Sequence, residues 1–207
     1  MKTKLRIAVL ASHSGTTLQS IIDACESGTL QARVCLVICN NSGATAAERA
    51  ARHAIPFRHL SSLTHSDPGQ LDRAICDALD EHESELVMLA GYMKKLGQRT
   101  IERFSGRILN THPALLPKHG GQGMYGDKVH EAVIAAGESE TGVTIHLVDG
   151  EYDAGPIVAQ CQIPVLPEDD GQSLAERVKQ REKPFLIETL QSIANGSRQL
   201  PLSATCG

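Results

Sequence analysis

The sequence predicts an α/β fold: a single Rossmann-like, doubly wound sheet, mostly parallel, with an antiparallel hairpin toward the C-terminus. In the first half, short apolar runs alternate with segments whose apolar residues recur at helical spacing, which is typical of strands joined by helices. In the second half, two strand-like runs are joined by one tight turn, which favours antiparallel pairing. The chain has 207 residues, 41% of them apolar, enough for one such domain.

Five strands are expected in the first half, each a short and mostly apolar run that favours burial on both faces. They cover residues 5–11, 34–39, 56–60, 86–90 and 107–111. Helical spacing predicts helices over 18–25 and 44–54, and a helical stretch over about 94–104. A further helix, before the fourth strand, begins with Asp67 as its N-cap and Pro68 at its first position. This alternation predicts that ligands bind beyond the carboxyl ends of the strands.

The second half begins with a long loop over 115–126 that contains four glycines. Long ordered loops in compact domains are often functional. A helix is expected over 127–136, and strands are expected over 142–148 and 156–164.

A C-terminal helix completes the predicted domain. Ser173 and Glu176 form its expected capping box, and Pro184 is expected to kink or divide it. No repeat, low-complexity tract or linker interrupts the chain. Residues 1–195 are therefore expected to form a single domain, and 196–207 a flexible tail.

Composition argues against several classes of protein. The formal net charge is -4, with no Trp, three Tyr and three Phe, so neither a basic nor a base-stacking nucleic-acid surface is expected. No apolar run approaches the roughly 20 residues of a membrane-spanning helix. The apolar stretch 7–11 is too short for an export signal. We expect a cytoplasmic protein that acts on small molecules, as a monomer or homodimer.

The six cysteines fit a reducing compartment. No Cys-x-x-Cys pair occurs, so the usual zinc and thioredoxin patterns are missing. Cys35 and Cys39 lie an even number of residues apart in one predicted strand, and we expect them on one face of it, as buried reduced thiols.

The first candidate site is the loop 12–18, between the first strand and the first helix. Gly15, Thr16 and Thr17 stand where the N–H groups of a helix N-terminus can bind a phosphate. The loop is neither a P-loop nor a dinucleotide fingerprint, because no Gly-Lys-Ser/Thr follows and its glycine stands alone. A Ser/Thr-rich helix start without a ligand stays an alternative.

The second candidate site is the end of the fifth strand. Asn110 and His112 are two residues apart, so their side chains should face one space, and Pro113 stops the strand there. An amide donor beside an imidazole can stabilise an oxyanion and move a proton. A polar pair that only satisfies loop backbone is the alternative.

The third candidate site is the turn 149–156, which holds the carboxylates of Asp149, Glu151 and Asp153. A carboxylate that reaches a histidine fixes its tautomer and raises its pKa. A solvated acidic turn is the alternative.

Metal and serine-hydrolase chemistry are not expected. The spacing of His112, His119, His130 and His146 matches no zinc signature, and His130 and His146 are expected to be satisfied structural histidines. The Gly-x-Ser-x-Gly motif of serine hydrolases is missing. We expect no bound metal.

Taken together, these segments resemble the folate-dependent formyltransferases, over about residues 7–193. The most specific likeness is Ile-Leu-Asn-Thr-His-Pro-Ala-Leu-Leu-Pro at 108–117, followed about 35 residues later by Tyr-Asp-Ala-Gly-Pro at 152–156. Residues 86–93 add to it. The length favours members that formylate the amine of 5'-phosphoribosylglycinamide in purine biosynthesis, with 10-formyltetrahydrofolate as cosubstrate.

The resemblance implies a role for each candidate residue. Asn110 would bind the formyl oxygen, His112 would donate a proton and Asp153 would be its charge partner. Gly15, Thr16 and Thr17 would hold the substrate phosphate, and Glu182 would face the substrate amine. The folate pocket would be lined by two segments: Met93, Lys94, Lys95 and Leu96, and Asp149, Gly150, Glu151 and Tyr152.

The chain departs from the family pattern at several positions. Thr17 stands where Asn is usual and His13 where Gly is usual, Pro68 replaces a basic residue, and Lys94 replaces Arg. The glycine-rich loop is longer than its commonest form. Two alternatives therefore stay open: a formyltransferase for another amine, such as an amino sugar or hydroxylamine, and a non-catalytic folate- or nucleotide-binding domain.

Overall fold

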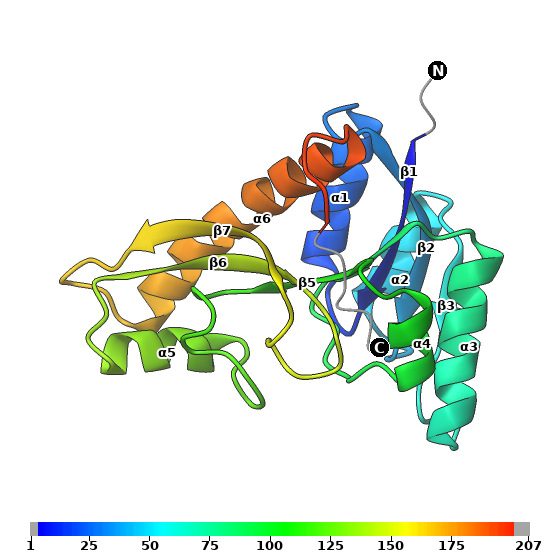
Figure 1. Ribbon diagram of the computed structural model, residues 1–207, viewed down its shortest axis with the longest axis horizontal. Helices are drawn as coiled ribbons and strands as arrows, with labels where there is room; N and C mark the ends of the chain where they lie inside the picture. The colour runs from blue at the N-terminus through cyan, green and yellow to red at the C-terminus, as the bar shows by residue number, and fades with distance from the viewer. Residues whose placement is uncertain (1–3, 201–207) are drawn as a thin grey trace.

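One seven-stranded sheet runs through the protein in the order β3-β2-β1-β4-β5-β6-β7 (Figure 1). The computed structural model describes residues 4–200. The strands are β1 (Leu5–Ala11), β2 (Ala32–Cys39), β3 (Phe57–His59), β4 (Leu86–Leu89), β5 (Ile108–His112), β6 (Glu140–Leu147) and β7 (Ile157–Pro164). β1 to β5 pair in parallel, whereas β6 pairs antiparallel with both β5 and β7. The predicted mostly parallel α/β sheet with an antiparallel hairpin is confirmed.

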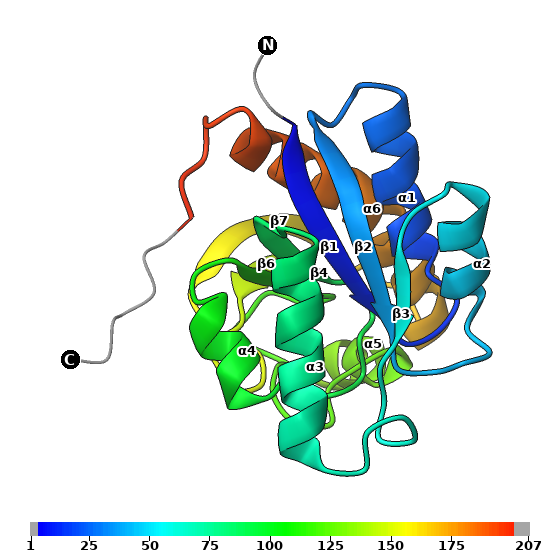
Figure 2. The ribbon, with the colours of Figure 1, turned by 90° about the vertical axis from the view of Figure 1, so that its right-hand side faces the viewer.

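Helices cover both faces of the sheet, as a doubly wound fold requires (Figure 2). They are α1 (Thr16–Glu26), α2 (Thr45–Arg52), α3 (Pro68–Glu81), α4 (Gln98–Arg103), α5 (Asp127–Ala135) and α6 (Gly171–Ala194). Alternate residues of β1 divide between two apolar clusters. Ile7 and Val9 pack with α1, α2, α5 and α6, whereas Ala8 and Leu10 pack with α3 and α4.

A bulge in β2 overturns one prediction about the cysteines. Ile7 pairs with Val34 but Ala8 pairs with Leu36, so Cys35 is the extra residue. The bulge shifts the alternation of side chains. Cys35 therefore packs in the α3/α4 cluster and Cys39 in the other, so the prediction that they share a face is wrong. Both are buried free thiols, as predicted, while Cys206 lies outside the described residues.

The fourth helix begins later than its apolar spacing predicts. α4 starts at Gln98, and residues 94–97 are loop. Its N-terminus is capped from α3: the Asp72 carboxylate accepts the N–H groups of Arg99 and Thr100. A Cβ on Gly97 would lie 2.1 Å from the Asp72 side chain, so only glycine permits this approach. A cap supplied by a distant segment leaves no local sequence signal.

The last helix also begins elsewhere than predicted. Its N-cap is Asp170, whose carboxylate accepts the Ser173 N–H at 2.8 Å, while the Ser173 hydroxyl accepts the Asp170 N–H at 3.1 Å. Ser173 is thus the N3 residue of the capping box and not its N-cap, so the predicted Ser173–Glu176 box is wrong. α6 is also not divided, since it continues through Pro184.

The predicted domain boundary at residue 195 stays a prediction. Residues 196–200 follow α6, and the Arg198 guanidinium donates to the Val158 carbonyl of β7. Residues 201–207 of the predicted tail lie outside the described residues. Among residues 4–200, no helix is both long enough and apolar enough to cross a membrane.

His130 of α5 should make the folded state sensitive to acid. It is buried and its Nδ1 has no hydrogen-bond partner among the described residues. Burial, reinforced by Lys179, lowers its pKa. The unfolded chain therefore takes up a proton at higher pH than the folded chain, so stability is lost as pH falls below about 6.5. We expect the thermal midpoint of His130→Gln to fall less between pH 7 and pH 5 than that of the parent. An equal fall in both proteins would contradict this.

Candidate active site

Asn110 and His112 end β5 on the same face of the sheet, as their spacing predicts. The alternation of β5 places Ile108 in the α3/α4 cluster, so Asn110 and His112 continue that face. Leu109 packs in the opposite cluster, and Thr111 continues the opposite face. His112 is only 3% exposed, and Asn110 is half-buried. The pair lies at the carboxyl edge of the parallel strands, where open α/β sheets bind their ligands.

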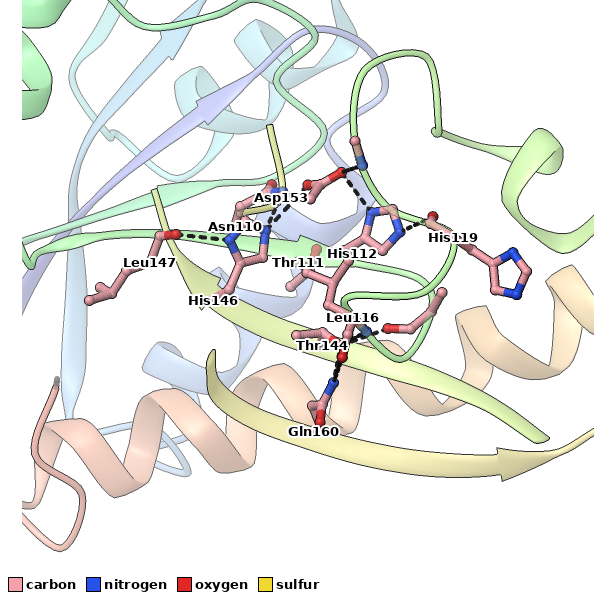
Figure 3. A network of polar contacts seen from close by, with 12 residues as sticks. Asn110, Thr111, His112, Leu116, His119, Thr144, His146, Leu147, Asp153 and Gln160 are labelled. Carbon is pink, nitrogen blue, oxygen red and sulfur yellow. Dashed lines mark hydrogen bonds and ion pairs between the residues drawn. The ribbon is translucent and has the colours of Figure 1, made fainter. Parts of the chain in front are cut away.

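Asp153 reaches this pair from the turn between β6 and β7 (Figure 3). One carboxylate oxygen lies 3.4 Å from His112 Nδ1 and accepts the Gly121 N–H at 3.0 Å. Burial would raise the pKa of Asp153, but the contact with His146, the N–H of Gly121 and the charge of His112 outweigh it, so the pKa is lowered. Asp153 is therefore ionised at neutral pH.

The turn that carries Asp153 is held tightly against β6. A Cβ on Gly155 would lie 1.9 Å from the Leu147 carbonyl oxygen, so a side chain there would push the turn off the strand. Asp153 itself has φ 55°, in the left-handed region that Asp and Asn tolerate better than most residues. The short spacing from Asp153 to Gly155 thus fixes the position of the carboxylate.

Both ring nitrogens of His112 face oxygen atoms. Nε2 donates to the His119 carbonyl at 2.8 Å, and Nδ1 faces Asp153. A neutral ring has only one N–H, so only the imidazolium can donate to both. Burial nevertheless lowers the His112 pKa, with Asp153 and the His119 carbonyl opposing it. Asp153 thus favours the protonated ring, as predicted, although burial outweighs it and the His112 pKa lies below its usual value.

His146 is a site residue that the sequence interpretation missed. It was expected to be a structural histidine, but β6 pairs it directly with Asn110. Its Nδ1 donates to the Leu147 carbonyl at 2.8 Å, which leaves Nε2 to accept from the Asn110 amide at 3.2 Å. Nε2 also lies 3.4 Å from Asp153. His146 therefore orients the amide of Asn110. Only the β5–β6 register places it there, and no local motif indicates that register.

A pocket opens beside these residues between two loops. It is lined by apolar side chains together with Asn110, His146 and Asp153. The apolar residues include Leu89, Tyr92, Leu96, Ile101 and Val148. An apolar pocket with a few polar groups at one end is the usual form of a site for a small organic molecule.

Most of the predicted folate-binding residues line this pocket: Lys94, Lys95, Leu96, Gly150, Glu151 and Tyr152. Lys95 lies 3.5 Å from the Glu151 carboxylate and over the Tyr152 ring, so the two loops meet across the pocket. Met93 and Asp149 are not among the lining residues. The Met93 N–H instead donates to the Ser12 hydroxyl.

The predicted phosphate loop lies at the adjacent carboxyl ends of β1 and β4. The hydrogen bond from Met93 to Ser12 joins these two strand ends, at the point where the strand order reverses. Gly15 is the N-cap of α1 with φ 65° and supplies no side-chain cap, so the N–H groups of the first turn, at Thr16 and Thr17, face no local acceptor. Arg49 donates to the Ser14 carbonyl and holds the loop in place.

Glu182 does not join the Asn110–His112–Asp153 cluster. It lies on α6, and the Thr111 hydroxyl donates to it at 2.8 Å. Thr111 points to the other face of β5, so Glu182 approaches the strand end from that side. Burial raises the pKa of Glu182. The two faces of β5 thus present a basic and an acidic side chain to the same strand end.

No group of three or more His, Cys, Asp or Glu side chains within residues 4–200 is arranged to hold a metal ion. What the arrangement offers instead is an amide donor, an imidazole and a carboxylate at the end of an apolar pocket. These groups can stabilise an oxyanion and transfer a proton.

The chain belongs to the formyl transferase family, whose model matches residues 5–190. It is 41% identical, over 177 residues, to the phosphoribosylglycinamide formyltransferase of Haemophilus influenzae, which covers 86% of this chain and 81% of that protein. The protein of the same name from Mycobacterium tuberculosis is 40% identical over 203 residues, covering 98% and 91% of the two chains. The predicted formyltransferase resemblance is confirmed.

A solved structure supports the family assignment at the level of the fold. Glycinamide ribonucleotide transformylase 1 from Symbiobacterium toebii superposes with a TM-score of 0.86 at 33% identity. The match covers 95% of this chain and 90% of that one. The sheet, its hairpin and the covering helices therefore form a known architecture of this family.

Proposed function

We propose that this protein transfers the formyl group of 10-formyltetrahydrofolate to the amine of 5'-phosphoribosylglycinamide, a step of purine biosynthesis. The observation that carries the proposal is the convergence of Asn110, His112 and Asp153 beside one pocket, which Asn110 and Asp153 line. The relatives named above support the choice of substrates.

The pocket residues fit a folate. Its reduced pterin is a compact bicyclic ring system with polar edges, and the apolar walls from Leu89 to Val148, together with Asn110 and Asp153, suit such a group. Lys94 and Lys95 are exposed at the rim, where cations suit the anionic glutamate tail of the molecule. When bound, the folate supplies the formyl carbon.

In the proposed reaction, Asn110 and His112 act on the formyl oxygen. The substrate amine attacks the formyl carbon, and negative charge develops on that oxygen. The Asn110 amide, oriented by His146, donates a hydrogen bond to it, and the positive charge of the protonated His112 ring stabilises it. Ionised Asp153 stabilises the protonated ring. A proton leaves the attacking nitrogen and one reaches the departing folate nitrogen, with His112 and Asp153 as the carriers.

The other predicted residues hold the second substrate. The N–H groups at Gly15, Thr16 and Thr17 bind its phosphate at the start of α1. Glu182, held by Thr111, faces its amine from the other side of β5. Holding two substrates in line supplies much of the remaining acceleration. We place the reaction in the cytoplasm, in keeping with the free thiols of the described cysteines.

A formyl-transfer assay with a panel of amines tests the proposal. Phosphoribosylglycinamide, an amino sugar nucleotide and hydroxylamine are each offered with 10-formyltetrahydrofolate, and the folate product is followed by its absorbance. We expect turnover with phosphoribosylglycinamide and competition by ribose 5-phosphate. Turnover confined to another amine, without that competition, would assign a different acceptor. Folate binding with no turnover on any amine would favour a binding domain.

His146 provides a further prediction. Replacing it with alanine leaves the Asn110 amide free to rotate and removes one neighbour of Asp153. We expect kcat to fall about tenfold, equivalent to one net hydrogen bond, with little change in either KM. Steady-state kinetics check this, and the partly exposed His65, replaced by alanine, is the control. If His146 were purely structural, its replacement would lower the thermal midpoint without lowering kcat of the folded enzyme.

A further inference from the structure

The turn that carries His119 holds one side of His112. The His119 carbonyl accepts the Nε2–H of His112 at 2.8 Å (Figure 3). His119 has φ 54°, a left-handed conformation that a residue with a side chain adopts at a cost. Such a conformation persists only when surrounding contacts hold it. The carbonyl position therefore depends on whatever fixes this turn.

Glu138 makes two of these contacts, at Lys118 and His119, while Thr144 and Gln160 hold Leu116 of the same turn. Glu138 lies between α5 and β6, and its carboxylate accepts from Lys118 Nζ at 2.9 and 3.1 Å. The same carboxylate lies 3.4 Å from His119 Nε2. Lys118 keeps the pKa of Glu138 low, so the carboxylate is ionised at neutral pH. One charge thus contacts the side chains of both Lys118 and His119, the last two residues of the turn.

We propose that Glu138 is a positioning residue for formyl transfer: it fixes the Lys118–His119 turn so that the His119 carbonyl stays on Nε2 of His112. Glu138 does not touch the substrates. It acts only through the carbonyl that favours the protonated His112 ring. The link to catalysis rests on the proposed function, because it matters only if protonated His112 is the donor.

The first test follows the His112 ring by NMR titration and needs no turnover. In Glu138→Ala the carbonyl loses its support, and since that carbonyl raises the His112 pKa, we expect the pKa to move further down. The other titratable groups acting on the ring are Asp153, His146, His119 itself and His130 of α5. All of them remain in the variant.

Glu140→Ala is the matched control. Glu140 carries the same charge and, with Glu138, lines a pocket beside Pro117, but no polar contact joins its side chain to the rest of residues 4–200. We expect the His112 pKa in this variant to equal the parent's. An unchanged His112 pKa in Glu138→Ala, or equal shifts in both variants, would overturn the proposal whatever the protein catalyses.

The second test is kinetic. We expect Glu138→Ala to lower kcat about three- to tenfold, the equivalent of one net hydrogen bond, with both KM values unchanged. The limb of the pH–rate profile that reports loss of the His112 proton should move to lower pH. If Glu138 had a merely structural role at the surface, Glu138→Ala would change the thermal midpoint but not the pH at which this limb falls. That result would count against the proposal.

His119→Gly is a second variant that tests the same contact. Glycine adopts φ 54° without strain and keeps the carbonyl, but it removes the ring that meets Glu138. Removing the His119 ring acts upward on the His112 pKa, because that ring lowers it. We expect the lost support of the carbonyl to outweigh this and to give a net downward shift, so the proposal stays testable if Glu138→Ala does not fold. A parental His112 pKa in this variant would show that the Glu138 contact does not position the carbonyl.

Discussion

Asp153→Asn should nearly abolish formyl transfer while leaving the fold intact. Asn keeps the shape of the side chain but removes the charge that favours the protonated His112 ring. Asparagine tolerates the left-handed backbone at φ 55° as well as aspartate does, so no new strain arises. We expect kcat to fall by about 10³- to 10⁴-fold, the scale of the loss when a histidine loses its carboxylate partner in a hydrolytic triad.

The measurement is the absorbance of the folate product, with thermal unfolding followed in parallel. Asp77→Asn is the control, because Asp77 is exposed on α3, away from the pocket. The control should match the parent in rate and in thermal midpoint. Parental turnover in Asp153→Asn would remove Asp153 from the mechanism, and a large fall in its thermal midpoint would make the carboxylate a structural group.

The sequence was enough to predict those parts of the site that depend on the alternation of side chains along a strand and on where the strand ends. Asn110 and His112 face one space because they are two residues apart in a strand that a proline stops. The start of α3 was equally local, since the Asp67 carboxylate accepts the Gln70 N–H three residues later. The family resemblance was needed to select Asp153 among the three acids of its turn.

The remaining parts depend on contacts between distant segments. His146 joins the site only because the β5–β6 register sets it against Asn110, 36 residues away. Asp72 caps α4 from α3, so the helix start was misplaced. The bulge at Cys35 is a mismatch between two strands and not a property of either one. The spacing of apolar residues within one segment carries no information about a strand register, a cap from another helix or a bulge.

His112→Ala should have an effect as large as the loss of its carboxylate partner. The ring is the only imidazole in the described site that contacts both Asp153 and the His119 carbonyl. General acid–base groups contribute up to about 10⁴-fold, and we expect kcat to fall by about 10³- to 10⁴-fold, as in Asp153→Asn. KM for both substrates should change little, because the pocket walls and the start of α1 are untouched. If the protein were a non-catalytic folate-binding domain, the parent would form no product and His112→Ala would have no effect on product formation.

The double variant His112→Ala/Asp153→Asn decides whether the two residues act as one unit. If Asp153 works through the His112 ring, removing it from a protein that lacks the ring should cost almost nothing further, since groups that act together are non-additive. Steady-state kinetics on the parent, both single variants and the double variant give the coupling. If the losses multiplied, Asp153 would act on the substrates independently of His112.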